Sequence, residues 1–168
     1  MGDILKKGKR LKDDKLNITM SFFIDRSGSM GDDSVDRCFD LANQLAEKEM
    51  KAYRDDKVVG DVGCRFFAFN DYISDVPKGQ SLSSSGGTMP LSKLIDYISK
   101  NTADDLINII ITDAEFNIEK SAITKLMKDM HGMVFLIANQ PKPECEEIER
   151  LMKGQFVFLQ ADSDFSLK

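Results

Sequence analysis

Leu106–Thr112, with the sequence Leu-Ile-Asn-Ile-Ile-Ile-Thr, is the most hydrophobic stretch of the chain and constrains its fold most strongly. A nearly continuous apolar run of this length is typical of a central strand in a parallel sheet that is covered on both faces. Parallel strands are joined by crossover connections, and these connections are usually helices. The stretch therefore predicts strands that alternate with helices along the rest of the chain.

The rest of the sequence contains this alternation. Runs rich in β-branched and aromatic residues predict further strands, at Asn17–Asp25, Asp61–Phe69, Met133–Ala138 and Gln155–Leu159. Apolar residues spaced three and four apart predict amphipathic helices, which lie over Val35–Tyr53, from Pro90 to Ile98, over Ala122–Met130 and from Pro143 to Met152. Asp32, Asp33 and Ser34 precede the first helix and offer it an N-cap.

The remaining strand is predicted at Tyr72–Val76, directly after the short turn Asn70-Asp71. A turn this short joins antiparallel strands, so Tyr72–Val76 is expected at an edge of the sheet. The fold class is therefore α/β, with a doubly wound, mainly parallel six-stranded sheet, one short antiparallel edge strand and helices on both faces. We expect one domain at 17–160, preceded by a charged N-terminal leader at 1–16 and followed by a short C-terminal tail at 161–168.

Composition excludes several classes of protein. The formal net charge of −5 argues against a nucleic-acid binder. The sequence has no apolar run of about 20 residues that would span a membrane, and its first residues do not resemble a secretory signal. A cytoplasmic protein is expected. The cysteines, Cys38, Cys64 and Cys145, form no CxxC pair, so we expect reduced thiols rather than a zinc site or a redox pair.

Three polar loops are predicted to meet at one edge of the sheet. The first strand ends in Asp25–Met30, with the sequence Asp-Arg-Ser-Gly-Ser-Met, and the central strand ends in Thr112-Asp113. The third loop ends in Gly86–Thr88, with the sequence Gly-Gly-Thr, directly before a predicted helix. In a doubly wound sheet, the first and central strands are neighbours where the winding of the chain reverses. The three loops can therefore converge on one crevice.

The residue types in these loops suit a hard cation. The candidate ligands are carboxylate and hydroxyl oxygens, from Asp25, Ser27, Ser29, Thr88 and Asp113. Such oxygens suit Mg²⁺, Mn²⁺ or Ca²⁺, and no His or Cys is near in the sequence to favour zinc. Taken one loop at a time, the alternative is ordinary capping of turns and helices. Met30 is expected to be a lid or packing residue rather than a ligand.

These three motifs, in this order, resemble the metal-ion-dependent adhesion site of von Willebrand factor type A domains. The resemblance extends over about Asn17–Leu159 and includes Phe69-Asn70-Asp71 before the edge strand. It implies that the hydroxyls of Ser27, Ser29 and Thr88 bind the metal directly. It also implies that Asp25 and Asp113 bind it directly or through water.

The resemblance implies a function as a protein-binding module. A metal held largely by neutral hydroxyls keeps much of its positive field, so it attracts an Asp or Glu from a partner protein. Two features depart from the family pattern. Ala114 stands where a Gly often follows the last motif, and Glu115 comes next. In addition, only Gln160–Lys168 follow the last strand, which is too short for the final helix that moves in family members that switch affinity.

Other functions remain as alternatives. An Asp at the end of the first strand is also found in haloacid-dehalogenase-like phosphatases, which use Mg²⁺, but these need a second Asp where this chain has Ser27. Nucleotide binding at Gly86–Thr88 is a further alternative, although no Gly-Lys-Ser/Thr motif follows. His131 is the only histidine and is expected in a surface turn. No serine shows a His-carboxylate relay, so we expect a binding protein rather than an enzyme.

Overall fold

The computed structural model describes residues 16–56, 59–77, 80, 82–101 and 107–167. The predicted leader, except Leu16, and the predicted strand residue Leu106 lie outside the described residues. The described strands are β1 (Leu16–Asp25), β2 (Val59–Phe69), β3 (Ile73–Asp75), β4 (Ile107–Thr112), β5 (Met133–Ala138) and β6 (Phe156–Gln160). The described helices are α2 (Asp32–Arg54), α3 (Leu91–Asn101), α4 (Lys120–Met127) and α5 (Pro143–Leu151).

The strands form one six-stranded sheet in the order β3-β2-β1-β4-β5-β6. β3 pairs antiparallel with β2, and every other neighbouring pair in this sheet is parallel. The chain proceeds from β1 outward to β2 and β3, and then returns to β4 on the other side of β1. The predicted doubly wound α/β fold is confirmed, and its winding reverses between β1 and β4.

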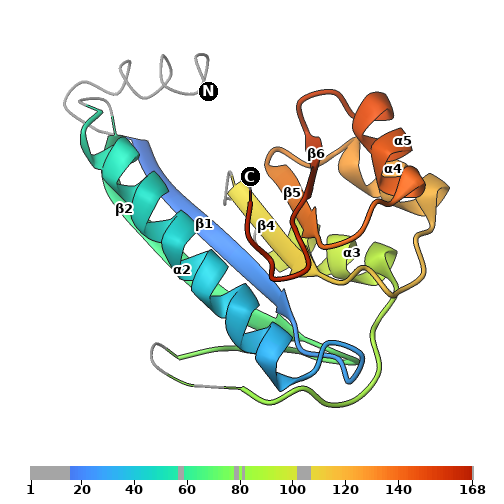
Figure 1. Ribbon diagram of the computed structural model, residues 1–168. Coiled ribbons are helices and arrows are strands. Elements are labelled where there is room, and N and C mark those ends of the chain that lie inside the picture. Colours follow the sequence, from blue (N-terminus) through green and yellow to red (C-terminus); the bar gives the residue numbers. More distant parts are fainter. Residues whose placement is uncertain (1–15, 57–58, 78–79, 81, 102–106, 168) are drawn as a thin grey trace.

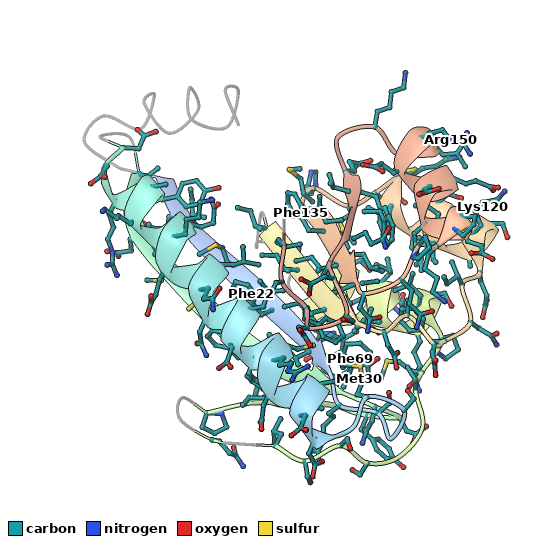
Figure 2. The ribbon with its side chains drawn as sticks, viewed as in Figure 1. Phe22, Met30, Phe69, Lys120, Phe135 and Arg150 are labelled. Carbon is teal, nitrogen blue, oxygen red and sulfur yellow. The ribbon has the colours of Figure 1, made fainter. Side chains whose placement is uncertain are left out.

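The helices cover the two faces of the sheet unequally. Figure 1 shows α2 running along β1 and β2 on one face, where it buries Val35, Cys38, Leu41, Ala42 and Ala46. Phe22 of β1 belongs to the core on this side and is marked in Figure 2. The buried residues of α3, α4 and α5 form a second core on the opposite face. The sheet is thus the middle of three layers, as continuous apolar strands require.

Several boundaries differ from those that the sequence predicts. β2 begins earlier, at Val59, and β3 is shorter than Tyr72–Val76 because Tyr72 lies in the turn with an 80% exposed side chain. The N-cap of α2 is Gly31, without a side-chain cap bond, so the predicted cap by Asp32–Ser34 is wrong. Instead, the Asp32 carboxylate accepts hydrogen bonds from the amide and hydroxyl of Ser84, in a distant loop.

The chain after β6 packs onto the sheet. Residues 161–167 contain no helix, and their turn places Ala161 and Phe165 in the same core as α2. The Ala161 amide also donates to the Ala138 carbonyl at 2.7 Å. None of the helices that the structure describes is both long enough and apolar enough to cross a lipid bilayer.

Candidate metal centre

The predicted site lies at the carboxyl ends of β1 and β4, the neighbouring strands between which the winding reverses. Ile24 pairs with Ile111, so Asp25 and Thr112 lie level at the ends of their strands. Met30 and Phe69 lie at this same end of the molecule in Figure 2. This edge is where ligands bind in doubly wound sheets, because the loops on either side of the reversal separate and leave a crevice.

Asp25 is held at the base of the site. Its side chain is fully buried, and its Oδ1 accepts a hydrogen bond from the Ser27 amide at 2.8 Å. Its Oδ2 accepts one from the Thr112 hydroxyl at 2.6 Å, and that hydroxyl oxygen accepts in turn from the Ala114 amide at 2.9 Å. The carboxylate of Asp25 is therefore fixed by two loops before any ligand binds.

A row of oxygens from the same two loops lies beside Asp25. The hydroxyls of Ser27 and Ser29 are 3.2 Å apart, and the Ser29 hydroxyl donates to Asp113 Oδ2 at 2.9 Å. Ser27 and Asp113 are buried, whereas Ser29 is exposed. In octahedral coordination at about 2.1 Å, neighbouring ligand oxygens lie about 3.0 Å apart. The observed spacings therefore fit the ligand set of a small divalent cation.

Thr88 belongs to a third loop, which is hydrogen-bonded to the loop after β1. The Gly28 amide donates to the Gly86 carbonyl at 2.9 Å, and the Ser85 amide donates to the Arg26 carbonyl at 2.8 Å. Thr88 follows Gly86 by two residues, which span at most about 7 Å of extended chain. Hydrogen bonds thus join four of the five predicted ligands to one another. The fifth, Thr88, has a partly exposed side chain, and its loop is joined to the first loop through backbone hydrogen bonds.

Burial makes the ionised form of the Asp25 carboxylate unfavourable. Burial raises the pKa of Asp25 above its ordinary value of 3.8, and the nearby charge of Asp113 adds to this effect. Hydrogen bonds from Thr112 and Ser27 lower the pKa of Asp25 and oppose the rise in part. Burial also raises the pKa of Cys38 on α2, with smaller contributions from Asp25 and Asp113. A cation at the site would stabilise the ionised form of this buried carboxylate.

The donor set is rich in hydroxyls. The described residues contain no group of three or more His, Cys, Asp or Glu side chains arranged to hold a metal. The candidate site has two carboxylates and three hydroxyls, from the five residues named above. This set is too hard for zinc and suits Mg²⁺, Mn²⁺ or Ca²⁺, so the residues present fit the cations that the sequence predicts.

The structure adds one residue to the predicted site. Thr112 was expected only as the end of the central strand, but its hydroxyl links Asp25 to the amide after Asp113. The signal in the sequence is a hydroxyl residue directly before the Asp at a strand end.

The remaining residues that the sequence singles out lie outside this set of oxygens. Met30 packs in the core, and His131 and Glu115 are exposed. Cys38 and Cys145 are buried thiols, and Cys64 is half-buried.

No protein-family model matches this sequence, and no curated protein matches it either. Among solved structures, the chain is similar to the crystal structure of the ArnB paralog VWA2 from Sulfolobus acidocaldarius, with a TM-score of 0.49 and 12% sequence identity. The similarity covers 87% of this chain and 42% of that protein, so this chain spans less than half of its length.

Proposed function

We propose that this chain is a divalent-metal-dependent protein-binding module of the von Willebrand factor type A kind. In this proposal Ser27, Ser29 and Thr88 supply hydroxyl oxygens to Mg²⁺ or a similar cation. Asp25 and Asp113 bind the cation directly or through water. The partner is a protein, within a cytoplasmic assembly, that presents an Asp or Glu to the site.

One observation carries this proposal. The Ser29 hydroxyl lies between the Ser27 hydroxyl and the Asp113 carboxylate, at 3.2 and 2.9 Å, although Ser29 and Asp113 are 84 residues apart in sequence. A capped turn explains a bond within one loop, but it does not explain hydroxyls from one loop grouped on the carboxylate of another. The exposed position of Ser29 leaves this row of oxygens open to solvent on one side.

The chemistry of the site favours a partner with a carboxylate. When bound, a divalent cation supplies a positive field and a coordination position that an outside oxygen can fill. Three of the five ligands are neutral hydroxyls, so the cation keeps more of its positive field than it would among carboxylates alone. The Thr112 hydroxyl holds the Asp25 carboxylate at the base of the site, and Ser29 and Thr88 keep exposed surface that a partner can reach.

The test is a titration with Mn²⁺. Binding is measured by calorimetry and by the loss of the electron paramagnetic resonance signal of the free ion. The wild-type chain should bind one Mn²⁺, and Mg²⁺ should displace it. Ser29→Ala should weaken binding at least about tenfold, because it removes an oxygen that lies between two others. Ser121→Ala, which changes an exposed serine on α4, is the matched control and should bind as the wild type does.

A second measurement addresses the partner. Immobilised wild-type protein should retain a binding protein in Mg²⁺ and release it when a chelator is added, and Ser29→Ala should not retain it. A partner that binds the wild type and Ser29→Ala equally well, with or without chelator, would show that recognition does not pass through this centre.

A further inference from the structure

The turn between β2 and β3 holds the loop that carries Thr88. The Gly87 amide donates to Asp71 Oδ2 at 2.8 Å, and the Met89 amide donates to the Asn70 carbonyl at 3.0 Å. These are the residues directly before and after Thr88. The Asn70 side-chain amide also donates to the Ser85 carbonyl at 3.0 Å. The backbone on both sides of Thr88 is therefore fixed by two consecutive residues of a distant turn.

The two glycines of the Thr88 loop allow this close approach. A Cβ atom at Gly87 would lie 2.8 Å from Asp71 Oδ1, a distance that real Cβ atoms essentially never show. A Cβ at Gly86 would lie 3.1 Å from both Asn70 Nδ2 and Asp71 Oδ2, and Gly86 also has a positive φ of 77°. Gly86 is thus required by its backbone conformation, and the lack of a side chain at Gly87 lets the Asp71 carboxylate approach its amide.

The turn is itself ordered by local hydrogen bonds. The Asn70 amide donates to the Tyr72 carbonyl, and the Tyr72 amide donates to Asn70 Oδ1, both at 3.0 Å. Because the backbone of the turn is already ordered, a side chain on it can hold another loop with little further loss of conformational entropy. Asp71 is an exposed residue, yet its carboxylate is directed to a backbone amide rather than only to water.

We propose that Asp71 is a positioning residue of the metal centre, which holds the Thr88 hydroxyl in place through the Gly87 amide. This inference rests on the proposed metal-binding function. Asp71 contacts the loop and is not itself a ligand. Its role is to fix the conformation of Gly86–Thr88 before the metal binds. Without this contact, the loop would have to become ordered when the metal binds, and the entropy lost would weaken the affinity.

Three variants test this role. Asp71→Ala removes the acceptor, so hydrogen exchange at the Gly87 amide should speed up in metal-free protein, and Mn²⁺ binding should weaken by about 10- to 100-fold. Asp71→Asn keeps an acceptor oxygen and loses the charge, so it should restore both slow exchange and an affinity within about threefold of the wild type. Asp75→Ala, an exposed aspartate of the same hairpin, is the control and should change neither measurement.

Gly87→Ala provides a test of the contact itself. Gly87 is not among the glycines with positive φ, so alanine fits the backbone there and the main obstacle is the Asp71 carboxylate. The substitution should push the Asp71 carboxylate away from the Gly87 amide and weaken Mn²⁺ binding. Combined with Asp71→Ala, it should bind no more weakly than Asp71→Ala alone, because both changes break the same contact.

Two outcomes would overturn the positioning role. If Asp71→Asn loses as much affinity as Asp71→Ala while exchange at Gly87 stays slow, Asp71 acts through its charge. If Asp71→Ala speeds exchange but binds Mn²⁺ as the wild type does, the contact orders the loop without serving the metal. A wild-type chain that binds no Mn²⁺ would instead refute the proposed function, and the exchange measurement would still show whether Asp71 orders the loop.

Discussion

Asp25 shows at the scale of one residue how a binding site can oppose stability. Burial raises the pKa of Asp25 above 3.8, so at neutral pH its ionised form is less favourable in the folded chain than in the unfolded chain. The contribution of Asp25 to stability is therefore greatest at pH values below 3.8 and is lost as the pH rises through the raised pKa. Metal binding, by contrast, requires the ionised form.

Asp25→Asn separates these two effects. The amide is nearly the same size as the carboxyl and carries no charge, so the metal-free variant should melt at or above the temperature of the wild type at pH 7. Its binding of Mn²⁺ should be lost, and added Mg²⁺ should raise the melting temperature of the wild type alone. Thermal unfolding with and without Mg²⁺ measures both. A metal-free variant that melts well below the wild type would mean that the charge of Asp25 stabilises the fold.

The residues of the site also show which contacts a sequence can predict. The grouping of Asp25, Ser27 and Asp113 follows from strand order alone, because parallel strands that are neighbours end at the same edge. The bonds from Asp32 to Ser84 and from Asp71 to Gly87 have no such signal. They join loops whose conformations are set by tertiary packing. In addition, an Asp before a helix, such as Asp32, is predicted from the sequence to cap that helix rather than to bind a distant loop.

At the scale of elements, β4 is the strand on which both cores depend. Each of its residues is buried, and its side chains alternate between the two faces of the sheet. Ile109 and Ile111 belong to the core beneath α2, and Ile110 belongs to the core beneath α3, α4 and α5. The sequence predicts this strand closely because an uninterrupted apolar run needs cover on both faces. A strand that is apolar on both faces does not indicate which helix packs against which face.

Ile110→Ala should therefore destabilise the protein strongly. Ile110 is fully buried, and its truncation leaves a cavity against helices on one face, at an expected cost of about 2–5 kcal/mol in the free energy of unfolding. Ile110→Val keeps most of the volume and should cost about 0.5–1.5 kcal/mol. Urea denaturation measures both values, and an unchanged m-value would show that the unfolded state is the same. Equal stability of the two variants would mean that the core around Ile110 is loosely packed.

At the scale of the whole molecule, the chain after β6 completes the layer that α2 begins. The sequence predicts only a short C-terminal tail at 161–168, in which Asp162, Ser163 and Asp164 precede a single Phe165. In the structure, Asp162 Oδ1 accepts hydrogen bonds from the amides of Asp164 and Ser166, and this turn directs Phe165 into the core. One aromatic residue without a periodic pattern carries no secondary-structure signal, so its burial could not be predicted.

Phe165→Ala tests whether this segment is part of the fold. Phe165 is 2% exposed and adopts a positive φ of 59°, a conformation that a bulky side chain keeps only when its surroundings hold it there. Its truncation should lower the free energy of unfolding by about 3–5 kcal/mol. Asp164→Ala is the control from the same turn: its ion pair with Arg37 joins side chains that are 66% and 49% exposed, so its loss should cost less than about 1 kcal/mol. If Phe165→Ala is as stable as Asp164→Ala, the segment adds nothing to the core, and α2 alone covers that face of the sheet.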